Sequence, residues 1–315
     1  MQQQRGIALI TILVMVALAT ILAATIVKRQ AYTADNTAYL MRQNQSLLYT
    51  KSAEAFFSEL LVDDAENAGD VDHLQENWAK PMPAFPVEDG FILGSLQDQS
   101  GKFNLNSLLK EDGTPNPQAK LWFEKLLVRL GFPAELSEAV IDWQDPDDEV
   151  SGAMGAESSY YRGLAQDYLA PNHKFHSVEE LKLVRGFEGQ KYLKIMNYVA
   201  AFPLSESKVN INTASALVLA SIDPKLNVDA VQQVLQQRQA KFEYFSSPNQ
   251  LWEIEPFKQV DSAIRSEMNN LLGVQSSYFK ANIEVVLSER KRQFSSDLVR
   301  KNKTVYVAYR SMAPF

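Results

Sequence analysis

The chain has 315 residues, which at roughly 150 residues per domain suggests about two domains. It is 46% apolar and 22% charged, a composition typical of a protein that folds around a buried core. A net charge of −7 argues against an extended nucleic-acid-binding surface. The absence of cysteine excludes disulfides, Cys-ligated zinc and thiol chemistry, and with only three histidines a zinc site is not expected.

The N-terminal segment carries the clearest pattern. Residues 7–27 contain no charge and no proline, and as a helix they extend about 31 Å, close to the hydrocarbon thickness of a bilayer. Arg5 precedes the run and Lys28-Arg29 follow it. This pattern predicts a membrane-spanning helix. A cleaved secretory signal peptide is the alternative, with a nominal cleavage pattern at residues 17–19, although the apolar run is longer than such peptides carry.

The helical pattern continues beyond the apolar run, because residues 28–68 contain neither proline nor glycine. Apolar residues recur there at spacings that place them near one helix face: Tyr32, Tyr39, Leu40, Leu47, Leu48, Phe56, Phe57, Leu60 and Leu61. We therefore expect one continuous helix of about 60 residues, with half in lipid and half packed on a folded domain.

This arrangement resembles type IV pilins and type II secretion pseudopilins, whose leader ends in glycine directly before an apolar helix. Here the leader ends in Gly6. The resemblance implies that prepilin peptidase cleaves between Gly6 and Ile7, and that Ile7 becomes a methylated N-terminus. The family usually has a glutamate at the fifth mature position, where this chain has Thr11. Because a carboxylate in lipid needs a partner, its absence suits a subunit at the end of the filament, with nothing above it.

Short strand patterns bracket a long middle segment. Residues 78–86 contain three prolines and cannot be helical, whereas residues 91–96 predict a strand, residues 98–101 a turn and residues 102–106 the return strand of a hairpin. Residues 279–287 and 304–309 predict further strands, with the charged stretch 289–292 between them. The middle reads as mostly helical, with candidate helices at Pro117–Leu130, Ala134–Trp143, Ser177–Val184, Lys191–Ala200, Ala214–Ala220, Val228–Gln239 and Asp261–Leu271.

The predicted fold class is therefore α+β: a pilin-like fold, with a long N-terminal helix and a small antiparallel sheet, interrupted by a large inserted α-helical domain. The predicted parts are a leader (1–6), the transmembrane part of the helix (7–27), the first part of the pilin-like domain (28–110), the inserted helical domain (111–275) and the C-terminal strands (276–315). The size and the missing glutamate both resemble the K-type minor pseudopilin of type II secretion systems.

The most distinctive polar segment is acidic, with five carboxylates in residues 142–149 and no base before Arg162. Carboxylates held in one loop repel one another, and calcium, which accepts six to eight oxygens in irregular geometry, relieves this better than magnesium or zinc. A solvated acidic surface is the alternative. The run 145–149 followed by Tyr160-Tyr161 is similar to the calcium-binding region of K-type pseudopilins, which implies a structural Ca²⁺ ion. The candidate ligands are Asp142, Asp145, Asp147, Asp148, Glu149 and Glu157.

A second resemblance favours a different function. Residues 209–215 and 245–251 resemble helix-hairpin-helix DNA-binding modules, some of which belong to membrane-anchored DNA-uptake proteins, and residues 175–181 echo the second segment as a weak internal repeat. Two observations argue against DNA binding. The hairpin position, residues 221–225, contains no glycine, and residues 203–273 hold six bases and eight acids.

No nucleophile elbow, P-loop or dinucleotide fingerprint is present, so we do not expect an enzyme. The resemblance implies a minor pseudopilin at the tip of the type II secretion pseudopilus, single-pass in the bacterial inner membrane, with its N-terminus cytoplasmic and its bulk periplasmic. Its implied partners are other minor pseudopilins in a ternary tip complex, the major pseudopilin, prepilin peptidase and the inner-membrane assembly platform, with no nucleic acid. We expect assembly contacts at Thr11, Leu40, Leu47 and Phe56. The alternative is a membrane-anchored helix-hairpin-helix protein of DNA uptake.

Overall fold

The structure is a computed structural model that describes residues 5–67, 69–204, 207–301 and 303–312. The α-helices of this part are α1 (Arg5–Asn67), α2 (Pro117–Arg129), α3 (Leu136–Asp142), α4 (Ser158–Tyr161), α5 (Gln190–Ile195), α6 (Ala216–Ala220), α7 (Val228–Ala240) and α8 (Ser262–Met268). Its 3₁₀ helices are η1 (Asn77–Ala79), η2 (Leu105–Leu108), η3 (Val178–Leu183), η4 (Pro248–Glu253) and η5 (Phe257–Gln259). Its strands are β1 (Met82–Val87), β2 (Gly90–Asp98), β3 (Phe103–Asn104), β4 (Val199–Ala200), β5 (Val209–Asn210), β6 (Leu272–Gly273), β7 (Tyr278–Leu287), β8 (Arg290–Lys301) and β9 (Thr304–Met312).

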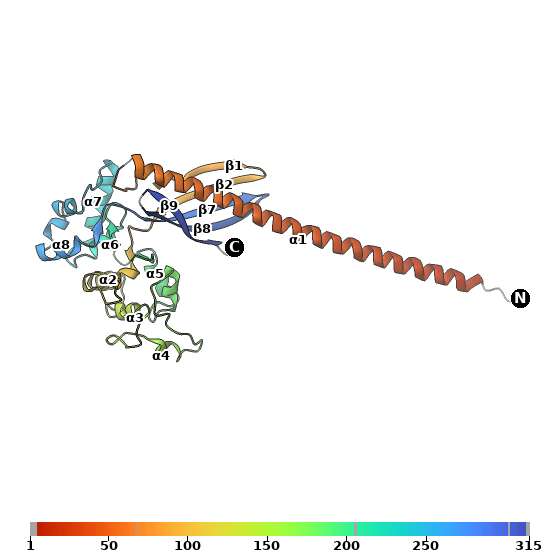
Figure 1. The fold of residues 1–315 in the computed structure, drawn as a ribbon, viewed down its shortest axis with the longest axis horizontal. Helices are drawn as coiled ribbons and strands as arrows, with labels where there is room; N and C mark the ends of the chain where they lie inside the picture. Colours follow the sequence, from red (N-terminus) through yellow and green to blue (C-terminus); the bar gives the residue numbers. More distant parts are fainter. Residues whose placement is uncertain (1–4, 68, 205–206, 302, 313–315) are drawn as a thin grey trace.

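Helix α1 is unbroken over 63 residues, which confirms the predicted continuous helix. Its N-terminal half projects away from the rest of the molecule (Figure 1). This half includes a window of 18 residues with a mean hydropathy of 2.8 and no buried side chain. The hydroxyl groups of Thr11, Thr20 and Thr25 donate hydrogen bonds to carbonyl oxygens one turn earlier in the helix. Apart from these internally bonded hydroxyls, residues 7–27 of the projecting half offer apolar side chains to their surroundings, as a membrane helix does.

The C-terminal half of α1 packs on the sheet through a face that overlaps only in part with the predicted apolar face. The buried residues of this half form a stripe of small, polar and apolar side chains: Ser46, Thr50, Ala53, Glu54, Phe57 and Leu61. Phe57 and Leu61 belong to the predicted set, and Leu47 is half-buried. Leu40 and Phe56 are 57% and 49% exposed, and Leu48 is exposed too, so these predicted members are wrong. The spacings of four and three that start at Ser46 select the polar and small members of the stripe, which an apolar pattern does not show.

The sheet has the strand order β1-β2-β7-β8-β9, and each neighbouring pair is antiparallel. Strand β2 pairs with β7 along its whole length, from Gly90 opposite Leu287 to Asp98 opposite Phe279. The chain between these two strands leaves the sheet and forms the helical block, residues 103–273, that lies beyond the end of α1 in Figure 1. A long helix, an antiparallel sheet and an inserted helical block confirm the predicted α+β class.

Two predictions about strands need correction. The segment 102–106 does not return beside β2: its strand β3 pairs in parallel with β4, and the hairpin partner of β2 is β1. Strand β1 was not predicted because it contains Pro83 and Pro86, which an edge strand tolerates since half of its amides face away from the sheet. Strand β8 was missed as well, because it begins in the charged stretch and nine of its twelve residues are polar.

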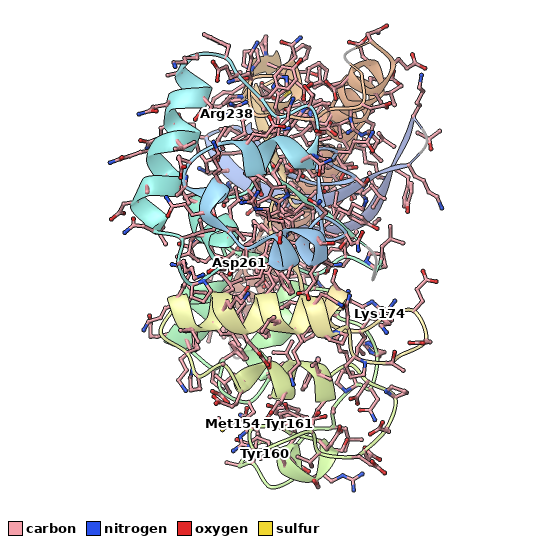
Figure 2. All side chains as sticks on the ribbon, turned by 90° about the vertical axis from the view of Figure 1, so that its left-hand side faces the viewer. Met154, Tyr160, Tyr161, Lys174, Arg238 and Asp261 are labelled. Carbon is pink, nitrogen blue, oxygen red and sulfur yellow. The ribbon has the colours of Figure 1, made fainter. Side chains whose placement is uncertain are left out.

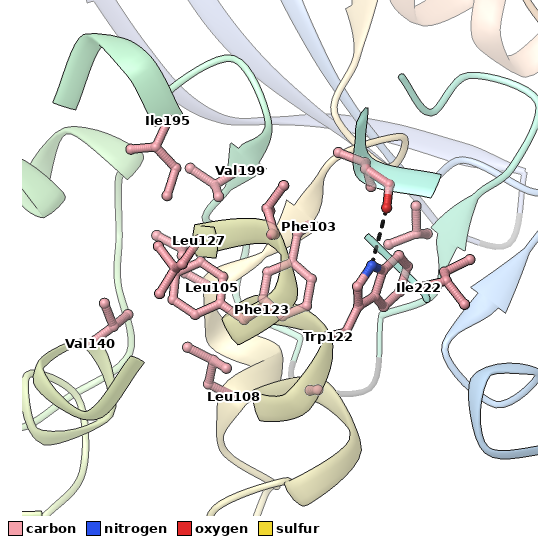
Figure 3. Close-up of a cluster of buried hydrophobic side chains, with 14 of the residues drawn as sticks. Phe103, Leu105, Leu108, Trp122, Phe123, Leu127, Val140, Ile195, Val199 and Ile222 are labelled. Carbon is pink, nitrogen blue, oxygen red and sulfur yellow. Dashed lines mark hydrogen bonds between the residues drawn. The ribbon is translucent and has the colours of Figure 1, made fainter. Parts of the chain in front are cut away.

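The helical block has its own core, which extends in sequence from Phe103 to Leu272. Figure 3 shows its centre, where Phe103 and Phe123 stack with ring centroids 5.2 Å apart and the indole N–H of Trp122 donates to the Val218 carbonyl at 3.1 Å. This bond joins α2, in the first half of the block, to α6 in the second. Residues 103–109 belong to this core although they precede the predicted boundary at residue 111.

The two halves of the block contain the same short strand pairing and the same asparagine hydrogen bonds. The weak internal repeat in the sequence therefore corresponds to a repeat in the structure. Each half begins and ends with a two-residue strand, and these strands pair in parallel, β3 with β4 and β5 with β6. In the first half Asn106 exchanges two hydrogen bonds with the backbone of Phe175, at 2.9 and 2.8 Å. In the second half Asn212 exchanges two with the backbone of Phe245, at 3.0 and 2.7 Å. Each asparagine thus holds a distant aromatic residue beside the start of its module.

Candidate functional site

The acidic segment surrounds the end of α3. Asp142 is the last residue of α3, Asp145 follows in the next turn, and Glu157 directly precedes α4. All three are buried, and each offers a carboxylate oxygen within 4.8 Å of the other two. The chain from 146 to 156 therefore forms a loop that returns Glu157 to the end of α3.

Several oxygens in this cluster have no hydrogen-bond partner among the described residues. Both carboxylate oxygens of Glu157, Oδ1 of Asp145 and Oε1 of Gln144 are buried and accept nothing. A buried polar atom that is left unpaired costs about 1–3 kcal/mol, and more when it is charged. Three such atoms belong to the carboxylates of Asp145 and Glu157 in one cluster, an arrangement that a hard cation stabilises, since calcium is bound by carboxylate oxygens.

The pKa values of the carboxyl groups in the cluster also favour a bound cation. Burial, then repulsion from Asp142 and Asp145, raises the pKa of Glu157 to about 8. Burial, then repulsion from Asp147, raises the pKa of Asp145 to about 7. The pKa of Asp142 is also raised by burial, although hydrogen bonds from Ser151 oppose the shift. Near neutral pH these carboxyls therefore resist ionisation until a positive charge is brought close.

Local structure explains how the loop closes. The backbone N–H of Ser151 donates to Asp142, at 3.1 and 3.3 Å from its two oxygens. A Cβ atom at Gly155 would lie 2.4 Å from the same carboxylate, so only glycine fits there. The Arg185 guanidinium donates to the Gly155 carbonyl at 2.9 Å and lies over the ring of Tyr160. This end of the block, with Met154, Tyr160 and Tyr161, is the end farthest from Arg238 in Figure 2.

The other three predicted metal ligands lie outside the cluster. Asp147, Asp148 and Glu149 are exposed, and Oδ1 of Asp147 accepts the backbone N–H of Glu149 at 2.8 Å. Gln144, by contrast, was not predicted as a ligand, although its amide oxygen is one of the unpaired atoms. Its position between Asp142 and Asp145 was the only signal in the sequence.

The processing and assembly residues lie along α1. Gly6 and Ile7 fall in its first turns, and the Ile7 side chain is exposed. Thr11 donates its hydroxyl hydrogen within the helix, to the carbonyl of Ile7 or of Ala8. Leu40 and Phe56 point away from the sheet, so their side chains are accessible to another molecule, whereas Leu47 is partly covered by the sheet core.

The segment that resembles the hairpin of helix-hairpin-helix modules lies against helix α2. Residues 221–227 connect α6 to α7. Lys125 donates to the Ile222 carbonyl at 2.7 Å, and Arg129 donates to the carbonyls of Asp223 and Leu226 at 2.9 and 2.6 Å. The connection thus presents carbonyl oxygens to two bases of α2. Phosphate binding at such a hairpin requires backbone amides instead.

A projecting apolar helix, a small antiparallel sheet and an inserted helical block define a pilin-like, membrane-anchored subunit. Comparison with known proteins is more specific. Two family models, both described as type II secretion system (T2SS) protein K, match residues 101–204 and 209–275, which together exceed half of the chain. The two matches coincide with the two halves of the helical block.

Curated relatives match along nearly their whole length. The chain is 30% identical to type II secretion system protein K of Aeromonas hydrophila, with 99% of this chain and 97% of that protein covered. It is 32% identical to the protein of the same name in Pseudomonas aeruginosa, with 98% and 93% covered. The chain belongs to the type II secretion system protein K family.

A solved structure supports the fold directly. One chain in the crystal structure of the GspK-GspI-GspJ complex from the type 2 secretion system of enterotoxigenic Escherichia coli superposes with a TM-score of 0.80 at 26% identity. The match covers 89% of this chain and all of that one. Family membership favours the predicted pseudopilin over the predicted DNA-uptake protein, and the apolar part of α1 agrees with a single-pass membrane anchor.

Proposed function

We propose that this protein is the subunit at the tip of a type II secretion pseudopilus, where it takes part in pseudopilus assembly and protein export by packing rather than by catalysis. The observation that carries the proposal is the superposition on a chain from a complex of three such proteins, GspK, GspI and GspJ. The partners we propose are the counterparts of the other two minor pseudopilins, the major pseudopilin, prepilin peptidase and the inner-membrane assembly platform.

The position at the tip is supported by two features of this chain. Thr11 satisfies its hydroxyl within its own helix, so the helix does not need a partner above it at this position. The helical block extends beyond the C-terminal end of α1, away from the membrane segment, where it would obstruct a further subunit (Figure 1). In this proposal the N-terminus is cytoplasmic and the sheet and helical block are periplasmic.

Co-purification tests the proposal. The full-length chain in detergent should form a stable complex with the counterparts of GspI and GspJ from the same bacterium, and should co-purify with them at a fixed stoichiometry. Because Phe56 of α1 is exposed, we expect Phe56→Glu to weaken the complex and leave the subunit folded. Phe57 is buried, so Phe57→Glu should unfold the subunit instead. A chain that is folded but never joins these proteins would not be a tip subunit.

Processing of the N-terminus is a separate expectation. Gly6→Ala should leave a longer product that retains residues 1–6 and an unmethylated N-terminus, because the peptidase of this family cuts after glycine. Thr25→Ala, within the same helix, should be processed normally. Intact mass and N-terminal sequencing of the natural protein distinguish the alternatives: a mature chain that starts near residue 20 would identify a cleaved signal peptide instead.

We further propose that the cluster of Asp142, Asp145 and Glu157 holds a structural calcium ion. Support comes from buried carboxylate oxygens that have no other partner and from raised pKa values that a cation would lower. When bound, the ion would neutralise the cluster and keep residues 146–156 folded against α3. Exposed Asp147, Asp148 and Glu149 remain candidates for the outer part of its shell.

A further inference from the structure

A cavity of about 230 Å³ lies where the segment after α1 meets the second half of the helical block. It is lined by residues 73–75 after α1, by residues 211–216, by one face of α7 and by residues 243–245 in the turn that follows α7. Helix α7 is at the end of the molecule opposite the membrane segment (Figure 1). The cavity has many times the volume that one water molecule needs, so it has room for a small ligand.

The free polar groups of this cavity are side-chain amides. Gln232, Gln236 and Gln239 line it from α7, where spacings of four and three residues place them on one face of the helix. All three are exposed, and their side chains form no hydrogen bond with a described residue. Because an amide both donates and accepts hydrogen bonds, this wall suits a ligand that does the same. Other polar side chains of the wall already have partners within the protein: Asn212 with Phe245, Thr213 with Asp98, and Ser215 with the backbone of Val218.

The charged residues that line the cavity are balanced. Arg238 pairs with Glu243 at 3.3 Å and donates to the Tyr244 carbonyl at 3.0 Å. Its guanidinium also lies over the ring of Phe245, 4.2 Å from the centroid. Burial lowers the pKa of His73, so its imidazole is uncharged near pH 7. An anion or a metal ion would therefore meet no free opposite charge here, and an apolar ligand would leave the glutamine amides without partners.

Two exposed aromatic rings lie in the turn after α7. Tyr244 is 44% exposed, and its ring stacks on that of His73 with the centroids 4.2 Å apart. Phe242 is 78% exposed and has a φ of 58°. This left-handed position after a helix is usually occupied by glycine, because a side chain is strained there. An exposed aromatic ring that is kept in a strained conformation beside a cavity indicates a role in binding rather than in packing.

The first half of the block fills the corresponding place with its own chain. Trp143 in the first half and Arg238 in the second are equivalent, since each lies against the aromatic residue that the asparagine of its half holds. Gln144 follows Trp143, is buried, and donates to the Leu105 carbonyl at 3.2 Å. Gln239 follows Arg238, but its amide is exposed and unpaired among the described residues. The place that is filled from within in the first half is thus open in the second.

The walls offer little to an extended peptide. Such a peptide binds by adding a strand to a free sheet edge, where backbone N–H groups are available. Here the backbone N–H groups of residues 211–214 all donate within the protein. Those of α7 that line the cavity are used in the helix itself. Side-chain amides and aromatic rings therefore remain as the groups that recognise a ligand.

We propose that this cavity binds a neutral saccharide with acetamido groups, of the kind that forms the glycan of the bacterial cell wall. The hydroxyl groups at the edge of a sugar ring donate and accept, as the glutamine amides do, and the C–H groups on its face pack against an aromatic ring. An acetamido group adds an amide that pairs with a glutamine through one donor and one acceptor. The source of the saccharide rests on the proposed function, since a tip subunit that moves outward from the inner membrane meets the cell wall.

Helix α7 supplies matched variants. Gln232 and Gln236 line the cavity, whereas their sequence neighbours Gln233 and Gln237 are exposed but do not line it. The double variants Gln232→Ala/Gln236→Ala and Gln233→Ala/Gln237→Ala thus remove the same groups from the same helix, and neither should lower the melting temperature, because alanine favours helix. Phe242→Gly removes the exposed ring and relieves the strained backbone, so this variant should be at least as stable as the unchanged chain.

The test titrates triacetylchitotriose, the trimer of N-acetylglucosamine, into the full-length chain in a detergent without a sugar headgroup, with binding measured by ligand-observed NMR. We expect Gln232→Ala/Gln236→Ala to weaken binding about tenfold and Gln233→Ala/Gln237→Ala to leave it unchanged. Phe242→Gly should weaken binding about threefold or more without loss of stability. Cellotriose, the corresponding trimer without acetamido groups, should bind at least about fivefold more weakly.

The remaining outcomes contradict the inference in different ways. No binding of triacetylchitotriose, or equal weakening by the two double variants, would overturn the saccharide site. Equal affinities for the two trimers would overturn the assignment to acetamido sugars. A loss of affinity for the counterparts of GspI and GspJ in Gln232→Ala/Gln236→Ala would assign the cavity to a partner protein instead. Failure of the unchanged chain to join those proteins is measured separately, and would remove the proposed function and the cell wall as the source but not the binding of the sugar.

Discussion

At the scale of single residues, the chemistry is concentrated at Glu157. Its carboxylate is buried beside those of Asp142 and Asp145, and neither of its oxygens accepts a hydrogen bond from a described residue. A group in this situation destabilises the folded chain when it is ionised, because both desolvation and like charges oppose it. In the proposed calcium site the same group would become favourable once the cation is bound, so this single position would make stability depend on metal.

Glu157→Gln should separate these two effects. Without calcium the variant should be as stable as the unchanged chain or more stable at pH 8, because it removes the charge that burial opposes. Calcium should raise the free energy of unfolding of the unchanged chain by about 2.7 kcal/mol at a concentration about 100 times Kd, and therefore raise its melting temperature; a chelator should reverse the rise. The rise should be largely lost in Glu157→Gln. Differential scanning calorimetry with and without calcium measures all of these quantities.

Glu149→Gln is the matched control, since it removes one charge from an exposed position of the same acidic segment. It should retain most of the calcium-induced rise. If calcium does not shift the unchanged chain, or if Glu149→Gln loses the rise as completely as Glu157→Gln, then the cluster is an acidic surface and not a metal centre.

The candidate site could be predicted from the sequence only in part. Six acids in and after one segment were visible, because composition alone shows a density of like charge. Which of them are buried was not visible, since burial follows from how the loop 146–156 returns to α3 through Ser151, Gly155 and Arg185. Gln144 is uncharged and therefore left no signal in an argument built on charge.

At the scale of elements, the placement of α1 on the sheet depends on a buried ion pair. Glu54 of α1 is 3% exposed, and its carboxylate accepts hydrogen bonds from Nε of Arg310 in β9, at 2.6 Å, and from the Ser296 hydroxyl in β8, at 2.5 Å. Nη2 of Arg310 bonds the second oxygen. Since these contacts reach two strands at once, they define both the position of the helix along the sheet and its rotation.

Glu54→Ala should therefore cost about 2–3 kcal/mol of unfolding free energy, because Arg310 is left without its partner in a partly buried place. Arg310→Ala in the same chain should recover part of the loss, since the unpaired charge is then gone. Urea unfolding measures each value. Glu59→Ala, at an exposed position one turn further along α1, should change stability by less than about 0.5 kcal/mol. Equal costs at the two positions would mean that Glu54 does not anchor the helix.

The ion pair of Glu54 with Arg310 also shows why some helices and strands were predicted from the sequence and their packing was not. Helix length, strand β2 and most of the helices of the block followed from periodicity and from the positions of proline and glycine. The packing face of α1 did not, because Ser46, Thr50 and Glu54 are polar. The hydroxyls of Ser46 and Thr50 bond to carbonyl oxygens one turn earlier in the helix, and Glu54 has its partners in strands more than 200 residues away. Strand β8 was missed for a similar reason: its charged residues pair with α1 and with β7, contacts that exist only in the folded chain.

At the scale of the whole molecule, the sheet and the helical block are joined by a buried polar network. Asp98, at the end of β2, accepts hydrogen bonds from the hydroxyls of Thr213 and Ser276, at 2.5 and 2.7 Å. Burial raises the pKa of Asp98, and these hydrogen bonds oppose the shift. Asn210 donates to the Asp72 carbonyl and to Ser276 in the same network. The junction therefore connects the segment after α1, strand β2, the residues before β7 and the second half of the block.

Arg300 extends this junction to α1 and makes it sensitive to pH. Its guanidinium pairs with Asp64 of α1, at 2.9 Å, and with Asp72 of the following connection. Oxygens of Asp64, Asp72 and Glu76 lie within 4.8 Å of one another. Arg300 pairs with the first two, whereas Glu76 accepts hydrogen bonds from the backbone N–H of His73 and the indole N–H of Trp78. Burial, then repulsion from Glu76, raises the pKa of Asp64 from 3.8 to about 6, despite the ion pair with Arg300.

The stability of the whole chain should therefore fall as pH rises through this range. Between pH 4 and pH 6 the folded state holds a proton on Asp64 that the unfolded state has released, so the contribution of this group is complete below about pH 4 and is lost as pH passes 6. The loss is on the order of 2 kcal/mol.

Asp64→Asn cannot ionise, so its unfolding free energy should lack this part of the decline and exceed that of the unchanged chain at pH 7.5. Asp63→Asn, at the exposed neighbouring position, should follow the unchanged chain at every pH. Other buried carboxyls, Glu157 among them, decline in the same range in all three proteins, so the informative quantity is the difference between urea unfolding curves at each pH from 4.5 to 7.5. A constant difference between Asp64→Asn and the unchanged chain would show that Asp64 does not change its protonation over this range, and would contradict the prediction.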